Sequence, residues 1–558
     1  MMLKRELFVG LSTLSLLGAT VTGETIPGDE HFRVETLAEG FIDAMEITVL
    51  PTGDVLIAER TGALKWYSAE SGEVKVLKQF DVALKKKGLS RETGLLGVTA
   101  DPDFMENGWI YVYYSPERKE VHRLSRFTFR SGEFNKEKTL LEIKQTREEG
   151  VCHEGGSLAF DSAGNLFLST GDNTNPFKSN GYAPLDERRE NEEINSQRTS
   201  GNTNDLRGKI LRIRPTKNGK YDIPEGNLFS KNQKETRPEI FVMGCRNPWR
   251  IGVDQRTNVL YWGDVGPDAR KDSDRGPKGY CEVNQAAEAG NYGWPYFVAD
   301  NQAYAAFDFK KEEVGEKFIS EAPVNSSRLN TGLETLPAAQ EPLWFESRSC
   351  YCAGPVYYHD DYAEEEGKLP NTLDGCLITY DWNNGRMQLT KLDGEGGYEW
   401  KENWLHSKKF IHPSDVEMGK DGAMYVLEYG SPWYNGTDGK LKKVTYSEEA
   451  LAVMPEVTVD PRLEGISPEH PGYTLLAEAI CLSCHQTQVK SIGPRYLDVA
   501  ERYRENEKAG EILAKKILEG GVGVWGNVPM PPSPQYNEEQ VSQMVDAILS
   551  IGESGHKE

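Results

Sequence analysis

Short apolar or alternating runs, each bounded by turn residues, recur along most of this chain. A period of two is typical of β-strands, because alternate side chains then point to the same face of a sheet. The clearest runs are 54–58, 109–114, 165–169, 259–262 and 423–427. Glycine-containing turns stand before three of them, at 51–54, 161–165 and 419–422. The pattern predicts repeated hairpins of the kind that build β-propeller blades.

The repeat is irregular, and we attribute this to insertions such as 173–205 and 297–350. About 65 residues per unit over roughly 400 residues would suit six blades, which is within the usual range for propellers. We therefore predict a mainly β protein with a six-bladed β-propeller over 24–445. An array of β-sandwiches is the structural alternative.

The two ends of the chain differ from this region. Lys4 and Arg5 precede an apolar run at 7–21, and small residues at 21–23 resemble a cleavage site, so 1–23 is predicted to be a signal peptide. The run is too short for an ordinary membrane span, although an uncleaved anchor is the alternative. We expect a periplasmic or secreted protein with no membrane span in the mature chain.

The stretch 446–467 lacks the strand pattern and carries several prolines, which favours a semi-rigid linker. A further domain is predicted at 468–552, with a charged helical stretch at 496–516, and a polar tail at 553–558.

This last domain carries the most specific motif of the chain, formed by Cys481, Cys484 and His485. The spacing allows two thiols to attach a haem covalently while the adjacent imidazole ligates its iron. A zinc site is the main alternative. It would need further ligands, but after His485 the chain has no cysteine and only His556. The motif predicts haem c.

A second iron ligand is predicted at Met530, which stands among prolines that would fix its loop. A methionine that only fills the core is the alternative. With the Cys481 motif and a Gly493–Pro494 pair, 468–552 resembles a small, all-α class I cytochrome c domain. The resemblance implies that the Pro494 carbonyl orients His485, and it agrees with export from the cytoplasm.

Composition narrows the classes of partner. The chain is 38% hydrophobic and 10% aromatic, which is enough to build large cores. Its formal charge of −23 disfavours nucleic acid and anionic membrane surfaces as partners. The six cysteines outside the haem motif are predicted to form up to three disulfides if the compartment is oxidising. They are Cys152, Cys245, Cys281, Cys350, Cys352 and Cys376.

Within the β region, His153 and Asp172 stand at the two ends of one expected hairpin, where their side chains could meet. An imidazole held by a carboxylate is a competent general base for removing an alcohol proton. On spacing alone, a structural histidine and a turn-forming aspartate are the alternative.

Six ordered motifs between about 31 and 445 resemble the soluble sugar dehydrogenases that depend on pyrroloquinoline quinone (PQQ), including glucose and sorbosone dehydrogenase-like members. The motifs are 92–97, 101–104, 153–172, 206–212, 244–248 and 290–295. The resemblance implies a six-bladed propeller that holds PQQ and calcium on its axial face.

By this resemblance, His153 is the base on the substrate hydroxyl and Asp172 orients it. The resemblance further implies that Arg246 and Asn247 contact PQQ and that Glu92 lies near the cofactor or sugar. Backbone carbonyls of Gly266 and Pro267 are the implied ligands of calcium, a hard cation that prefers oxygen donors.

The chain departs from the family pattern where cations are expected to bind the PQQ carboxylates. His412 begins a segment that replaces an arginine-rich one, so we assign His412 to PQQ or substrate contact. The lysine expected one blade earlier is also replaced, and Arg386 is predicted to compensate.

Together these features predict a quinohaemoprotein that oxidises a sugar, aldose or polyol at PQQ and passes electrons through haem c to an external cytochrome or oxidase. The linker would raise the effective concentration of the haem at the propeller. One alternative is a carbohydrate- or ligand-binding propeller without PQQ that carries an electron-transfer cytochrome. Another is a calcium-dependent hydrolase or lactonase-type propeller.

Overall fold

The computed structural model describes residues 25–84, 92–130, 132–347, 349–393, 397–432, 436–450, 460–526, 529–533 and 535–552. The predicted signal peptide and the polar tail at 553–558 lie outside the described residues. None of the helices in the described part is both long and apolar enough to cross a membrane.

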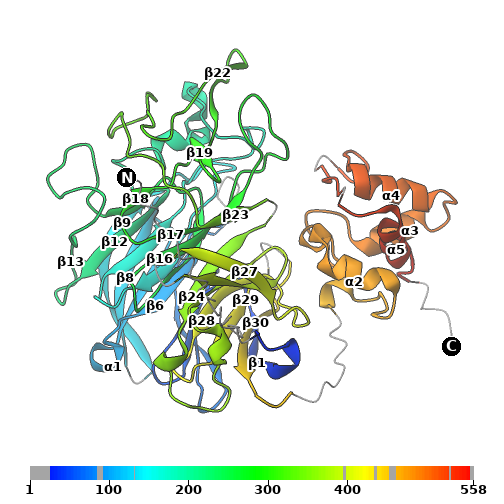
Figure 1. Cartoon of the computed structure of the whole chain (residues 1–558), viewed down its shortest axis with the longest axis horizontal. Helices are drawn as coiled ribbons and strands as arrows, with labels where there is room; N and C mark the ends of the chain where they lie inside the picture. The colour runs from blue at the N-terminus through cyan, green and yellow to red at the C-terminus, as the bar shows by residue number, and fades with distance from the viewer. Residues whose placement is uncertain are drawn as a thin grey trace, which may run out of the picture.

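A six-bladed β-propeller forms the larger part of the molecule, beside a smaller helical domain (Figure 1). From the axis outward, the first blade contains β2 (Ala44–Val49), β3 (Val55–Glu59), β4 (Ala63–Tyr67) and β5 (Val74–Gln79). The second contains β6 (Leu95–Ala100), β7 (Trp109–Tyr114), β8 (Val121–Arg130) and β9 (Glu133–Lys144). The third contains β10 (Leu158–Phe160), β11 (Leu166–Thr170), β12 (Lys209–Pro215) and β14 (Ile240–Met243). The fourth blade contains β15 (Pro248–Val253), β16 (Leu260–Asp264), β17 (Cys281–Ala286) and β23 (Trp344–Glu346). The fifth contains β24 (Tyr351–Tyr357), β25 (Cys376–Asp381), β26 (Arg386–Leu392) and β27 (Tyr398–Trp404).

The N-terminal strand closes the ring. The last blade contains β28 (Pro413–Met418), β29 (Met424–Glu428) and β30 (Gly439–Tyr446), and its outer strand is β1 (Phe32–Phe41). Strand β1 pairs antiparallel with β30, with Phe32 opposite Tyr446. One blade is thus built from both ends of the propeller sequence, and this pairing protects an edge that would otherwise be open.

The remaining strands of the propeller, and its α-helix, are short. They are α1 (Phe104–Asn107), β13 (Tyr221–Asp222), β18 (Gly290–Asn291), β19 (Phe297–Val298), β20 (Gln302–Ala303), β21 (Ala305–Asp308) and β22 (Glu313–Lys317). The predicted insertion at 297–350 contains β19 to β23, whereas the one at 173–205 contains short 3-10 turns.

Hydrogen bonds of buried polar side chains link the inner strands at the propeller axis. Arg250 of β15 is fully buried and donates from Nε to Ser414 O at 2.8 Å. Glu46 of β2 accepts from the backbone N–H of Val98 at 2.8 Å. Asp415 of β28 likewise accepts from the N–H of a residue in β2 at 2.8 Å. Each carboxylate thus satisfies backbone of a neighbouring blade, as buried polar groups require.

The helical domain contains η6 (Pro461–Leu463), α2 (Pro471–Glu478), η7 (Ile480–Ser483), α3 (Tyr496–Tyr503), α4 (Ala509–Glu519) and α5 (Glu538–Leu549). The prediction of one helical stretch at 496–516 is wrong, because the chain turns between α3 and α4. The Asn506 side chain accepts from the N–H of Lys508 at 2.9 Å, a local bond that competes with a continuous helix.

The helical core begins earlier in the chain than 468. Leu463 and Ile466, within the stretch predicted as a linker, are buried in this core, and Tyr446 is the last residue of β30.

All eight cysteines are free, so the structure contains none of the predicted disulfides. The strand register excludes one of the possible pairings, that of Cys352 with Cys376. Cys376 lies opposite Tyr357, and Cys352 lies opposite Tyr380, so neither thiol faces the other.

Candidate active site

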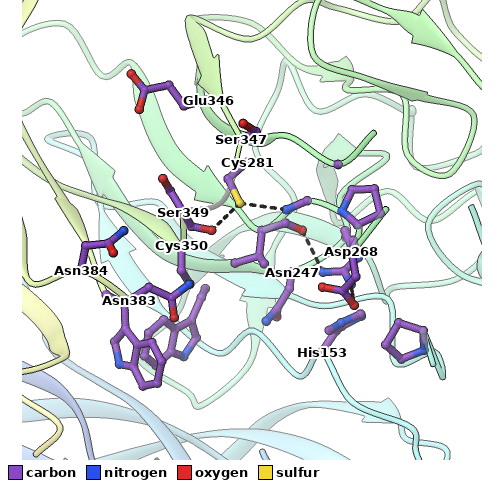
Figure 2. A pocket seen from close by; sticks show the side chains of 18 of the residues that line it. His153, Asn247, Asp268, Cys281, Glu346, Ser347, Ser349, Cys350, Asn383 and Asn384 are labelled. Carbon is purple, nitrogen blue, oxygen red and sulfur yellow. Dashed lines mark hydrogen bonds and ion pairs between the residues drawn. The ribbon is translucent and has the colours of Figure 1, made fainter. Parts of the chain in front are cut away.

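Two sets of propeller loops line a cavity of about 850 Å³ (Figure 2): loops that precede inner strands, and loops that join the second and third strands of a blade. All six blades or the loops before them contribute lining residues. The predicted residues among them are Glu92, His153, Arg246, Asn247, Gly266, Pro267 and Arg386. The volume is in the range of roughly 300–1,000 Å³ that small-molecule sites occupy.

The structure brings His153 and Asp172 together. His153 Nδ1 lies 2.7 Å from Asp172 Oδ1, across the hairpin of β10 and β11. Asp172 is fully buried and also accepts from Ser196 Oγ at 2.7 Å and from Trp294 Nε1 at 2.9 Å. Burial alone would raise the pKa of Asp172, but the charge and hydrogen bond of His153 hold it below its usual value. An ionised Asp172 fixes the tautomer of His153 with its proton on Nδ1, so Nε2 is the nitrogen left to accept a proton.

The backbone of His153 adopts a conformation that few side chains tolerate. Its φ is 68°, in the left-handed region, and its N–H donates to Glu92 Oε2 at 2.7 Å. Gly171 packs against the same backbone, and a Cβ there would come within 2.2 Å of His153 O. A residue held in strain by its surroundings is a feature of functional sites.

Arg246 and Asn247 are positioned by a single carboxylate. Asp264 accepts from the N–H of Arg246 at 2.9 Å and from the N–H of Asn247 at 2.6 Å. Asn247 Oδ1 in turn accepts from the N–H of Gly155 at 3.0 Å, which links this loop to that of His153.

Arg246 keeps one unsatisfied donor. Its NH1 donates to Val265 O at 3.0 Å, while its buried Nε has no hydrogen-bond partner among the described residues. A buried donor without a partner costs free energy, so the side chain suits an anionic ligand in the cavity.

The predicted calcium residues also line the cavity. No described donor hydrogen-bonds to the carbonyl oxygens of Gly266 and Pro267, which leaves both atoms available to a hard cation. The described residues contain no cluster of three or more His, Cys, Asp or Glu suited to a metal.

The assignment of His412 to cofactor or substrate contact is not supported by its position. The side chain is outside the cavity lining and 1% exposed, with Nδ1 2.8 Å from Gly430 O. Its ring stacks at 4.5 Å on Trp382, which does line the cavity. The nearby Ser414 supports Arg250 at the axis, so this segment serves packing.

Sequence reasoning missed several lining residues because they belong to no compact motif. One group is aromatic, and its rings lie 5.8 Å apart for Trp249 and Trp382 and 5.9 Å apart for Trp382 and Tyr429. The other group is cationic and contains Arg60, Arg270 and Lys278. Arg60 donates to Thr93 O at 3.3 Å and pairs with Asp43, so its charge is balanced within the propeller.

The cysteine motif and its histidine form a second site in the helical domain. His485 Nδ1 lies 2.8 Å from Pro494 O, and its ring is parallel to that of Tyr496 at 5.4 Å. A Cβ on Gly493 would come within 2.4 Å of the same ring. These contacts orient the imidazole and leave Nε2 for an iron ligand bond.

The Met530 loop is held by its own backbone. Met530 N donates to Gly521 O at 2.8 Å, and Gly521 N donates to Met530 O at 3.0 Å. Met530 packs against the helical core, and Cys481 and Cys484 are half-buried.

Comparisons with known proteins agree with this division. The glucose/sorbosone dehydrogenase family model matches residues 42–435, and the cytochrome c family model matches residues 470–551. Aldose sugar dehydrogenase YliI of Escherichia coli is 28% identical over 424 residues, covering 74% of this chain and 92% of that protein. Cytochrome c-552 of Hydrogenobacter thermophilus is 45% identical over 71 residues, covering 13% of this chain and 71% of that protein.

Solved structures share the propeller fold. The PQQ-bound aldose sugar dehydrogenase of Streptomyces coelicolor superposes with a TM-score of 0.50 at 17% identity, covering 75% of this chain and 98% of that one. The family model spans most of the chain, and the fold matches its members. The chain therefore belongs to the glucose/sorbosone dehydrogenase family and carries a cytochrome c domain after the propeller.

Proposed function

We propose that this protein is an exported quinohaemoprotein dehydrogenase that oxidises a hydroxyl group of a sugar, aldose or polyol. The observation that carries the proposal is the His153–Asp172 pair at the cavity. Asp172 fixes the imidazole, and Nε2 of His153 takes the hydroxyl proton of the substrate as its carbinol carbon loses hydride. The relatives named as aldose sugar dehydrogenases support this substrate class.

The cavity suits an anionic, planar quinone. Arg246 with its unsatisfied Nε, Asn247 and Arg386 would hold the PQQ carboxylates, and the aromatic wall would pack against its ring system. Gly266 and Pro267 carbonyls would hold calcium. When bound, PQQ supplies the two-electron acceptor chemistry, while the protein contributes orientation and electrostatics.

The cytochrome c domain implies haem c, attached at Cys481 and Cys484 and ligated by His485 and Met530. We propose that this haem takes electrons from the propeller one at a time and delivers them to an external acceptor. Because both sites belong to one chain, their effective concentration is independent of protein concentration. The apolar run at 7–21 supports export to the periplasm or beyond.

The proposal is tested by reconstituting purified protein with PQQ and calcium and following haem absorbance after mixing with a panel of aldoses and polyols. We expect substrate-dependent haem reduction whose rate constant is the same at every protein concentration. A rate proportional to protein concentration would show transfer between molecules. Saccharide binding without haem reduction would favour a binding propeller, and lactone hydrolysis without PQQ would favour a hydrolase.

A further inference from the structure

One wall of the propeller cavity comes from the cytochrome domain. Five residues that follow Met530 line the cavity together with the propeller loops, and we call them the cap. They are Pro531, Pro532, Ser533, Gln535 and Tyr536. The cavity is therefore enclosed by two domains, and the residues that enclose it include neighbours of the expected iron ligand.

Contacts beside the cavity hold the domains in this arrangement. Gln486, which follows His485, donates a hydrogen bond from Nε2 to Ser431 Oγ of the propeller. The Lys409 ammonium lies 5.5 Å from the ring centroid of Tyr473. A neighbour of His485 thus contacts the propeller, and neighbours of Met530 line the cavity, so the segments that carry both expected iron ligands lie on the side of the cytochrome domain that faces the propeller.

The chemistry of the cap suits a saccharide. The Gln535 amide both donates and accepts hydrogen bonds, as sugar hydroxyls require, and the Tyr536 side chain combines an apolar ring face with a polar hydroxyl. Gln535 is exposed, Tyr536 is half-buried against the core of the cytochrome domain, and Pro531 and Pro532 limit the backbone freedom of the cap. His153, Asn383 and Asn384 line the same cavity from the propeller side.

Resting on the proposed function, we infer that Gln535 and Tyr536 form a saccharide subsite that binds the part of the substrate distant from the hydroxyl at His153. The cavity of about 850 Å³ must hold both cofactor and substrate, so we expect the subsite to bind one or two sugar units within the cavity. A substrate that bridges the two walls also stabilises the docked position of the cytochrome domain.

The variants Gln535→Ala, Tyr536→Ala and Tyr536→Phe test this subsite in the full-length protein. Each loaded variant is assayed with glucose and maltose and a dye acceptor that reoxidises the quinone directly. Because the cap contacts ground and transition state alike, KM should rise about five- to tenfold for Tyr536→Ala while kcat stays within about twofold. Tyr536→Phe should raise KM by a smaller factor than Tyr536→Ala, because it keeps the ring and removes only the hydroxyl.

Matched controls are Gln488→Ala, an exposed glutamine of the same domain, and Tyr398→Ala, a 44% exposed tyrosine on the propeller. Haem absorbance confirms that each variant keeps its folded cytochrome domain. An unchanged KM in Gln535→Ala and Tyr536→Ala would overturn the subsite.

Calorimetric titration with glucose and maltose separates failure of the subsite from failure of the proposed function. If wild-type protein oxidises no sugar, aldose or polyol of the panel, the dehydrogenase proposal fails. The subsite is still supported if glucose or maltose binds wild type and binds Tyr536→Ala about five- to tenfold more weakly. Equal binding by both proteins, or no binding by either, overturns it.

Discussion

The haem-attachment site and the propeller cavity are built over very different distances along the chain. Cys481, Cys484 and His485 fall within five consecutive positions, and Pro494 is nine positions further on. The cavity instead combines residues from Met45 to Tyr536, which come from every blade and from the second domain. The first site depends on local backbone geometry, and the second depends on how strands, loops and domains pack.

This difference determines how each site should respond to mutation. A change in the local site should alter the haem and leave the propeller intact. A change in the assembled site should affect chemistry or stability and leave haem attachment intact. The predictions below separate the two sites, from the largest expected effect to the smallest.

The largest effect is expected at His153. Loss of a positioned general base costs about 10²- to 10⁴-fold in rate, so His153→Ala should lose turnover by this amount in the PQQ-loaded enzyme. PQQ titration and haem staining should remain normal. Ser196→Ala is the matched control, because it removes only a hydrogen bond to Asp172 and should reduce turnover less. Turnover near wild type in His153→Ala would show that His153 has a structural and not a catalytic role.

Arg250→Met should destabilise the propeller by about 3–5 kcal/mol, because it leaves the buried carbonyl oxygens of Ser414 and Met45 without their donor and removes the positive charge that lowers the pKa of Glu46. Denaturant unfolding followed by tryptophan fluorescence measures the loss. Arg256→Met is the control, since the exposed Arg256–Asp361 pair should contribute no more than about 1 kcal/mol. Equal losses in the two variants would contradict a central role for Arg250.

Met530→Ala should lower the haem potential on the order of 100 mV, a fraction of the ~0.8 V range that axial ligands cover. Attachment should persist because Cys481 and Cys484 remain. Redox titration and haem staining measure the two properties, and Met105→Ala, an exposed methionine of the propeller, is the control. A haem potential equal to wild type would exclude Met530 as a ligand.

The smallest effect concerns pH. Burial, reinforced by the charge of Asp264, raises the pKa of Glu282 from 4.5 to about 8. A carboxyl whose folded pKa is raised contributes stability that is fully present below its unfolded pKa and is lost as pH rises through about 8. Glu282→Gln should remove this dependence, a change on the order of a few degrees in Tm between pH 5 and 8. Thermal unfolding across this range should show no such change for the exposed Glu106→Gln. A wild-type pH profile in Glu282→Gln would contradict the prediction.

The strand pattern predicted the propeller because period-two runs and glycine turns are local signals that survive in any tertiary context. Motif order predicted that His153, Arg246 and Asn247 would share a site, and they line one cavity. The position of His412, outside the cavity lining and stacked on Trp382, was not predicted, because a sequence position in a motif does not show which side of Trp382 the ring occupies. The helix break at Asn506 was missed because one side-chain hydrogen bond outweighs modest helix propensity.

By itself, the sequence determined the haem-attachment spacing, the strand repeat and the pairing of His153 with Asp172 across one hairpin, since each depends on neighbours a few to some twenty positions apart. Only the tertiary structure decided that Trp249, Trp382 and Arg270 join the cavity, and that Gln535 and Tyr536 of the cytochrome domain close it. Those positions follow from ring closure and domain packing. Such contacts join residues hundreds of positions apart, and no local pattern encodes them.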